Sequence, residues 1–197
     1  EILAKYSGVP VYNGLTDSFH PTQALADILT IEENFGNCAG KKLCFVGDGR
    51  NNVARSLMVI SAKLGMHFTI VSPRELWPDS ELENLCESFA KASGSTLTIT
   101  DEVENGVKGA DAIYTDVWVS MGEEALKAER VKLLAPYQVN AELMAKTGNN
   151  ACIFLHCLPA VKGEEVTFDV IEGPQSKVFD EAENRKHTIK AIILATL

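Results

Sequence analysis

The feature that most constrains the fold of this chain is a regular alternation of short apolar runs with segments of helical character. Helices are expected at 21–33, 53–64 and 82–92. Five apolar runs are typical of buried strands, at 42–46, 67–71, 96–99, 112–115 and 153–156. Strands that alternate with helices predict a doubly wound parallel α/β sheet with helices on both faces. A further short strand is expected before this region, at 9–13.

The loops that follow the predicted strands place polar side chains at one edge of the sheet. Right-handed crossovers bring the carboxyl ends of parallel strands to the same edge, and open α/β sheets bind their ligands there. Four such loops occur, at 47–52, 72–74, 116–121 and 156–159. We therefore expect the functional site to be built from these loops.

The loop after the last predicted strand reads His156-Cys157-Leu158-Pro159. It puts an imidazole and a thiol at the carboxyl edge, and Pro159 ends the strand because it cannot donate to a ladder. A free cysteine is more often a small buried apolar residue than a functional one. This segment therefore indicates a site only in combination with the others.

The loop after the first predicted strand reads Gly-Asp-Gly-Arg-Asn-Asn, at 47–52. Its glycines let the backbone approach a ligand, and the helix that follows favours an anion at its start. The dinucleotide fingerprint requires glycine at the sixth position, where this chain has Asn52, so dinucleotide binding is disfavoured. An ordinary tight turn remains an equally supported interpretation.

Two more segments carry candidate binding groups. His20 and Gln23 lie one helical turn apart in a His-Pro-Thr-Gln motif, so they face the same side and can hold a carbonyl oxygen and an amide-like NH2 group. After the fourth predicted strand come the carboxylate of Asp116, the hydroxyl of Ser120 and the thioether of Met121. A carboxylate there can bind an ammonium group, and the following glycine permits a mobile loop. Simple helix capping is the alternative for both segments.

The last helix is expected to start near Glu181, with Arg185 in its first turn. A lone arginine most often lies on a solvated face, and the same is expected for Glu181, Glu183 and Lys186.

The composition excludes several kinds of partner. The net charge of −9 disfavours nucleic acid, which needs a basic surface. No apolar run reaches the roughly 20 residues of a membrane helix, and no signal-like segment opens the sequence, so a cytoplasmic location is expected. The first six residues look like the interior of a helix, so we expect the sequence to begin within a longer protein.

The cysteines are odd in number and none of them has CxxC spacing. This pattern predicts reduced thiols and no zinc site. The cysteines are Cys38, Cys44, Cys86, Cys152 and Cys157.

The motifs together, in this order and spacing, resemble those of the ornithine carbamoyltransferases across essentially the whole chain. The motif at 20–23 alone is shared with aspartate carbamoyltransferases. The Ser-Met-Gly loop at 120–122 and the His-Cys-Leu-Pro segment at 156–159 favour ornithine as the amine. A final Glu-Ala-Glu-Asn-Arg segment at 181–185 completes the set.

The resemblance implies a Rossmann-like α/β domain that binds L-ornithine, preceded by a remnant of an N-terminal α/β domain that binds carbamoyl phosphate. The expected boundaries are 1–36 for the remnant with its linking helix, 37–180 for the ornithine-binding domain, and 181–197 for a C-terminal helix that returns toward the first domain. The family's Ser-x-Arg-Thr segment, which grips phosphate, is missing from this sequence. The chain alone is therefore expected to be inactive.

The resemblance also implies an activity and a set of site residues. The enzyme transfers the carbamoyl group of carbamoyl phosphate to the δ-amine of L-ornithine, giving L-citrulline and phosphate in arginine biosynthesis. It implies no cofactor, no metal, no nucleic acid, no membrane partner, and a homotrimer or a higher multiple. Catalytic roles fall to Cys157, Asp116, His20 and Arg185. Substrate binding falls to His20 and Gln23 with Arg185 for the carbamoyl group, to Asn51, Asp116, Ser120 and Met121 for ornithine, and to Cys157 and Leu158 where the two substrates meet.

Two other functions stay open on the sequence alone. One is an isolated, non-catalytic domain that binds an amino acid and transfers nothing. The other is a related carbamoyltransferase that uses another amine, such as putrescine or an acylated ornithine.

Overall fold

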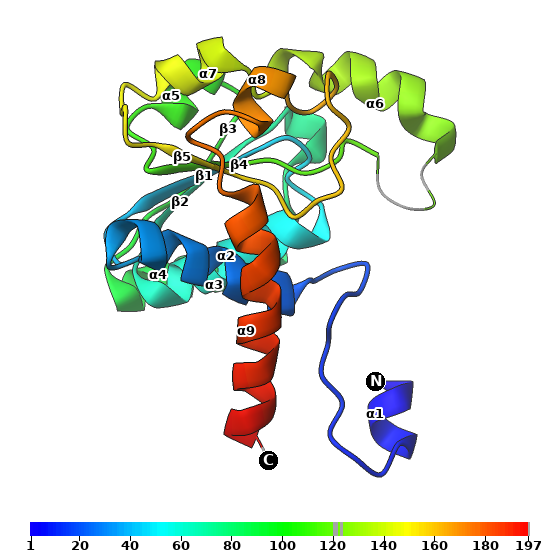
Figure 1. Cartoon of the computed structure of the whole chain (residues 1–197). Coiled ribbons are helices and arrows are strands. Elements are labelled where there is room, and N and C mark those ends of the chain that lie inside the picture. Colours follow the sequence, from blue (N-terminus) through cyan, green and yellow to red (C-terminus); the bar gives the residue numbers. More distant parts are fainter. Residues whose placement is uncertain (120–121, 123, 197) are drawn as a thin grey trace.

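A five-stranded parallel sheet forms the centre of the molecule, as the sequence predicts (Figure 1). The computed structural model describes residues 1–119, 122 and 124–196. The strand order is β3-β2-β1-β4-β5, and all four neighbouring pairs are parallel. The strands are β1 (Lys42–Val46), β2 (His67–Val71), β3 (Leu97–Thr100), β4 (Ala112–Tyr114) and β5 (Ile153–Leu155).

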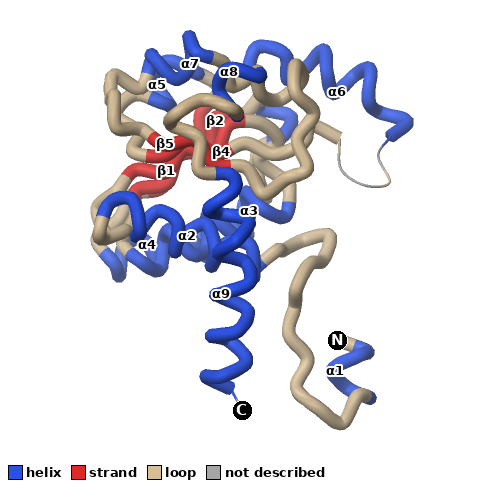
Figure 2. The backbone as a smooth tube through the Cα atoms, viewed as in Figure 1, coloured by secondary structure: helices blue, strands red, loops and turns tan. Residues whose placement is uncertain are grey.

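Helices cover both faces of the sheet, as Figures 1 and 2 show. On one face lie α2 (Pro21–Phe35), α3 (Asn52–Leu64) and α4 (Ser80–Ser93). On the other lie α5 (Val103–Val107), α6 (Lys127–Leu134), α7 (Ala141–Lys146) and α8 (Phe168–Ile171). The long α9 (Val178–Thr196) packs along α2 and extends away from the sheet. The short α1 (Ile2–Tyr6) lies apart from the other helices, at the end of an extended segment.

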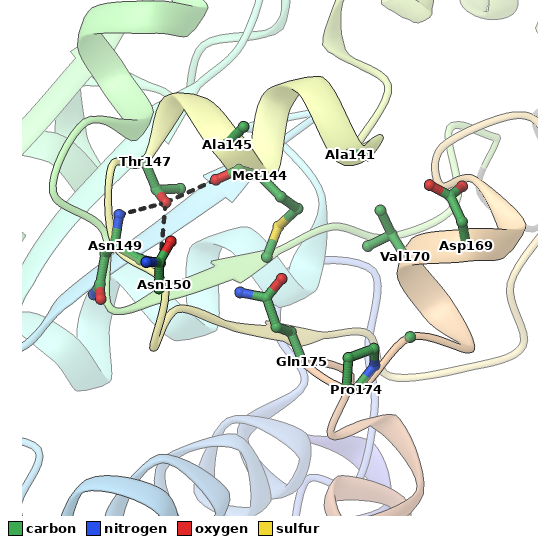
Figure 3. A pocket seen from close by; sticks show the side chains of 11 residues that line it. Ala141, Met144, Ala145, Thr147, Asn149, Asn150, Asp169, Val170, Pro174 and Gln175 are labelled. Atoms are coloured by element: carbon green, nitrogen blue, oxygen red, sulfur yellow. Dashed lines mark hydrogen bonds between the residues drawn. The ribbon is translucent and has the colours of Figure 1, made fainter.

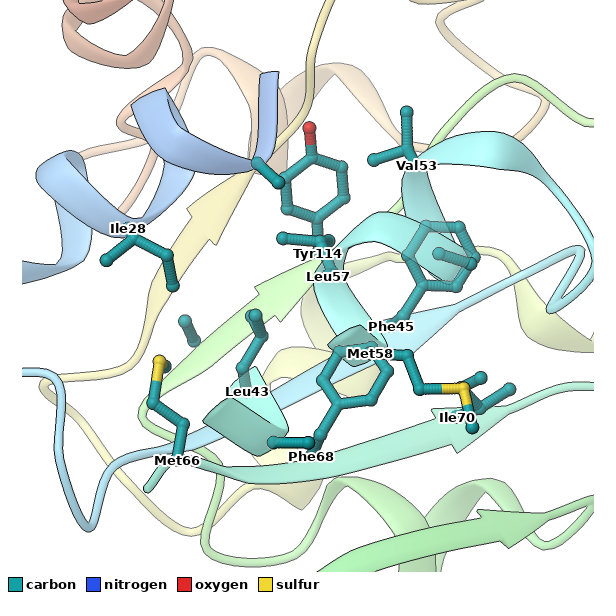
Figure 4. Packing of buried hydrophobic residues seen from close by; sticks show 14 of the residues in the cluster. Ile28, Leu43, Phe45, Val53, Leu57, Met58, Met66, Phe68, Ile70 and Tyr114 are labelled. Atoms are coloured by element: carbon teal, nitrogen blue, oxygen red, sulfur yellow. The ribbon is translucent and has the colours of Figure 1, made fainter. Parts of the chain in front are cut away.

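The sheet divides the apolar core into two clusters. Leu43 and Phe45 of β1 point toward α2, α3 and α4, whereas Cys44 and Val46 point to the opposite face. Figure 4 shows the first cluster, in which the rings of Phe45 and Tyr114 stack with centroids 6.0 Å apart. Strands buried on both faces read as continuous apolar runs, which is why the sequence identifies them.

Several predicted boundaries differ from the structure. The strand expected at 9–13 is wrong, because that segment has no neighbouring strand and its residues are exposed. A single extended segment forms no ladder, and its apolar residues do not bury themselves. The predicted helix at 21–33 runs on to Phe35 and ends at Gly36, whose φ of +75° suits glycine. The last helix begins at Val178, three residues before the predicted start.

The described helices also bear on membrane association. None of them combines the length and the apolar character that crossing a bilayer requires.

Candidate active site

The carboxyl edge of the sheet brings most of the predicted site residues together in two hydrogen-bonded groups. Asn51, Asp116 and Cys157 form the first, which we call the carboxylate group. His20, Gln23 and Arg185 form the second, which we call the amide group. Their elements are the ends of β1, β4 and β5, together with the start of α2 and the second turn of α9.

Asp116 is the centre of the carboxylate group. The side-chain amide of Asn51 donates to its Oδ2 at 2.7 Å, and the backbone N–H of Val117 donates to its Oδ1 at 2.8 Å. Cys157 Sγ lies 3.2 Å from the same Oδ1. Burial raises the pKa of Asp116, while these donors act in the opposite direction. A buried carboxylate in this setting gains from a cationic or amine ligand.

Asn51 does two tasks at once. Its Oδ1 accepts from the backbone N–H of Ala54 at 2.8 Å and so caps α3, while its Nδ2 donates to Asp116. Asparagine is a preferred residue at such a cap. The cap fixes which end of the amide faces Asp116, so the helix start orients a binding group.

His156 is a brace for the loop rather than a ligand-facing group. It has no exposed surface, its Nδ1 accepts from Leu158 N–H at 2.9 Å, and its Nε2 lies 3.3 Å from Glu165 Oε1. Leu158 has a φ of +56°, and the Leu158–Pro159 peptide is cis. The ring therefore holds the backbone that presents Cys157 and Leu158 to the site.

Asp116, His156 and Cys157 are also potential metal ligands. One donor atom from each lies within 4.8 Å of the others. Both ring nitrogens of His156 already have partners, however, so a metal ion would have to displace the hydrogen bond from Leu158. The geometry fits a hydrogen-bond network better than a metal site.

The amide group joins the start of α2 to α9. Arg185 Nη1 donates to Gln23 Oε1 at 2.6 Å and lies 3.3 Å from His20 Nε2. Burial, with Arg185 next, lowers the pKa of His20, so its imidazole is neutral and accepts from Arg185 through Nε2. This arrangement turns the guanidinium toward the site instead of toward solvent.

Two predictions for the last helix are wrong. Arg185 is the eighth residue of α9 rather than part of its first turn, and it is partly buried. Glu181 has no exposed surface, although it was expected on a solvated face. Both lie on the side of α9 that packs against α2. The sequence alone does not tell which side of α9 this is. Glu183 and Lys186 are exposed as expected.

Comparison with known proteins identifies the family. Residues 39–196 match the Asp/Orn-binding domain of aspartate/ornithine carbamoyltransferases, and residues 1–33 match the carbamoyl-P-binding domain of the same family. This chain belongs to the aspartate/ornithine carbamoyltransferase family. The sequence resemblance is therefore confirmed.

Relatives in this family are similar to the chain over its full length. It is 64% identical over 197 residues to the ornithine carbamoyltransferase of Caldanaerobacter subterraneus subsp. tengcongensis, covering 100% of the chain and 63% of that protein. The ornithine carbamoyltransferase structure from Pyrococcus furiosus superposes with a TM-score of 0.92 at 49% identity, covering 97% of this chain and 60% of the other. That from Gloeobacter violaceus gives 0.88 at 44% identity, covering 96% and 63%. The chain thus spans less than two thirds of these relatives.

Two of the predicted site residues, Ser120 and Met121, lie outside the described residues. Three residues that were not predicted as site residues form hydrogen bonds with the amide group or with one another: Asp27, Tyr114 and Glu181. A signal for two of them was present in the spacing. Asp27 follows Gln23 by four residues and Glu181 precedes Arg185 by four, so each shares a helical face with a predicted site residue.

A separate pocket of about 300 Å³ lies at the opposite, amino edge of the sheet, between α7 and α8 (Figure 3). Met144, Asn149, Asp169 and Gln175 are among the residues that line it. None of the predicted site residues that the structure describes lines this pocket.

The thiol of Cys157 gives a direct test of this geometry. We expect Cys157 to resist alkylation by iodoacetamide at about pH 7 and to react more slowly than an exposed thiol as the pH is raised. Burial and the neighbouring Asp116 hold the pKa of the thiol well above its usual range, and only the thiolate is nucleophilic. Asp116→Asn removes the adjacent charge and should speed the reaction at a given pH. Mass spectrometry of the Cys157 peptide measures the rate, and rapid labelling at neutral pH would contradict the assignment.

Proposed function

We propose that this chain is the ornithine-binding part of an ornithine carbamoyltransferase, which forms L-citrulline and phosphate from L-ornithine and carbamoyl phosphate. The observation that carries the proposal is the buried Asp116 carboxylate, held by Asn51 and Cys157 at the carboxyl edge of the sheet. It supplies a negative site for an amine, beside donors for a carbonyl oxygen. The similarity to ornithine carbamoyltransferases supports ornithine as that amine.

The proposed reaction is a displacement at the carbamoyl carbon. The lone pair of the neutral δ-amine forms the new C–N bond, the C–O bond to phosphate breaks, and the amine releases a proton. Arg185 and His20 hold the carbamoyl oxygen as it gains negative charge, and Gln23 contacts the same group. Bringing two substrates together in one orientation supplies much of the rate.

The ornithine roles follow the residues of the carboxylate group. Asp116 and Cys157 orient the reacting amine, and Asn51, Ser120 and Met121 hold the amino-acid end. Leu158 and Cys157 line the place where the two substrates meet. No cofactor or metal takes part in this scheme.

The proposed domain organisation assigns 1–36 to the carbamoyl-phosphate domain, 37–180 to the ornithine domain, and 181–197 to a helix that returns to the first domain. The ranges of the two family matches support this division. In this proposal the binding of carbamoyl phosphate depends on residues outside this sequence. The chain alone is therefore inactive. The complete enzyme is a cytoplasmic homotrimer or a higher multiple in this proposal.

A non-catalytic amino-acid-binding domain is the second candidate, because the chain spans only 63% of the length of the relative from Caldanaerobacter subterraneus. One experiment addresses both. The 197-residue polypeptide is assayed for citrulline formation and titrated calorimetrically with L-ornithine, with putrescine and N-acetylornithine as comparison ligands. We expect no product and selective binding of L-ornithine.

The contrary results are informative. Clear turnover would contradict the assignment of carbamoyl phosphate binding to missing residues. Preference for putrescine or N-acetylornithine would contradict ornithine as the amine. If the polypeptide joined to the missing part of the first domain binds ornithine but forms no citrulline, the non-catalytic reading is favoured.

A further inference from the structure

Two carboxyl groups lie buried directly beneath the amide group, where α2, α9 and β4 meet. Asp27 and Glu181 both have no exposed surface. The side-chain NH2 of Gln23 bridges them, donating to Asp27 Oδ1 at 2.7 Å and to Glu181 Oε1 at 3.0 Å. Tyr114 places its hydroxyl 3.0 Å from Glu181 Oε1. Two bare carboxylates this close in a dry interior would repel one another, so the pair must share a proton.

The distribution of donors indicates which carboxyl group carries that proton. Glu181 accepts from three groups: Gln23, Tyr114 and, at 2.9 Å on Oε2, the backbone N–H of His156. Asp27 Oδ1 accepts from Gln23 and lies 3.5 Å from the Tyr114 hydroxyl, which is nearer to Glu181, and Asp27 Oδ2 has no donor among the described residues. Hydrogen bonds stabilise the ionised form of the group that receives them. This distribution of donors favours Glu181 as the carboxylate and Asp27 as the acid.

The other titratable groups near the pair, and the directions of the two pKa shifts, are as follows. Arg185 on α9 lies above the pair, and Asp116 and Cys157 lie at the carboxyl ends of β4 and β5. Burial, followed by the charge of Glu181, holds the pKa of Asp27 well above its usual range. Burial also raises the pKa of Glu181, but the donors from Tyr114 and His156 oppose that shift.

We propose that Asp27 is a neutral acid that donates its proton to Glu181, and that this acid–carboxylate pair is a positioning device for Gln23. It deepens the proposed function, because Gln23 is one of the residues assigned to the carbamoyl group. Both N–H bonds of the Gln23 amide are used by the pair, so its oxygen has to face Arg185. A rotated amide would set its NH2 against the guanidinium, donor against donor. Gln23 is thus locked as an acceptor at the site.

The two conservative substitutions have opposite expected effects. In Asp27→Asn the new amide oxygen still accepts from Gln23 and its NH2 still donates to Glu181, so the variant reproduces the neutral acid. In Glu181→Gln the new NH2 group faces either Gln23 and Tyr114, in place of Oε1, or the His156 N–H, in place of Oε2. The network then loses at least one of its bonds, and we expect it to hold Gln23 less firmly. If instead Asp27 were the carboxylate, Asp27→Asn would be the disruptive change.

Nuclear magnetic resonance of the isotope-labelled chain tests the proposal without any assay of activity. We expect that at about pH 7 the carboxyl carbon of Asp27 has the shift of a protonated acid and that of Glu181 has the shift of a carboxylate. The side-chain NH2 protons of Gln23 should be protected from exchange in the wild type and in Asp27→Asn. Glu181→Gln should lose that protection, and Glu183→Gln, at an exposed site on the same helix, should not.

An ionised Asp27, or unprotected Gln23 protons in the wild type, would overturn the proposal. The wild-type titration decides this even if Glu181→Gln fails to fold. Tyr114→Phe offers a milder variant, since it removes the nearer donor from Glu181 and should raise the pKa of that group. Failure of the proposed function would appear as citrulline formation by the chain alone or as loss of ornithine binding. Neither result would change the carboxyl shifts or the protection of the Gln23 protons.

Discussion

Replacing Asp116 by Asn is expected to weaken the binding of L-ornithine by about 2–5 kcal/mol, a factor of roughly 30 to several thousand. The substitution keeps the shape of the side chain and removes its charge. The buried carboxylate accepts from Asn51, Val117 and Cys157 and lies where the amine is proposed to bind. An amide there can repel the ligand's N–H groups through its own NH2. The loss should therefore exceed that of an ordinary surface contact.

Calorimetric titration with L-ornithine measures this effect on the chain itself. Asp101→Asn is a matched control, because Asp101 follows β3 at the same edge and forms an exposed ion pair with Arg74. That change should leave ornithine affinity unaltered. Equal affinities for wild type and Asp116→Asn would remove Asp116 from the amine site.

The second large effect is expected for the stability of the fold. Glu165→Ala should lower the free energy of unfolding by roughly 3–5 kcal/mol, because removing one partner of a buried pair leaves the other uncompensated. Glu165 and His156 have no exposed surface, and Glu165 also accepts from the backbone N–H of Val161. Both donors lose their acceptor in the variant. The loop that carries Cys157 then loses its brace.

Urea unfolding followed by tryptophan fluorescence measures this loss. Glu164→Ala is the control at the adjacent position, where the side chain pairs with Lys127 near the surface. That exposed pair should contribute about 0–1 kcal/mol. If both variants lost a similar free energy of unfolding, the buried pair would contribute no more to stability than the exposed pair.

The sheet could be predicted from sequence because its strands are buried on both faces. Runs such as 42–46 and 67–71 are apolar nearly throughout, and each is bounded by a loop or a helical segment. The segment at 9–13 has the same local character but no neighbour to pair with. Pairing is a tertiary property, so local pattern alone could not reject that strand.

The site was predictable where its residues follow strands or begin a helix. Asp116 and Cys157 come directly after buried runs, and the sheet topology alone places them at one edge. Glu181 could not be placed in the same way. Its burial depends on which side of α9 meets α2, and acidic residues at a helix start are usually solvated. The sequence therefore predicted the upper layer of the site but not the carboxyl pair beneath it.

The pairing of α2 with α9 has a consequence for the order in which the protein is made. Gln23 and Arg185 are 162 positions apart, and the bond between them closes nearly the whole chain. During synthesis, the ribosome releases α2 and the entire sheet before α9 is available. The sheet can form at that stage, yet His20, Gln23 and Asp27 still lack their partners. A polypeptide that ends just before α9 would thus contain every strand of the sheet but lack part of the site.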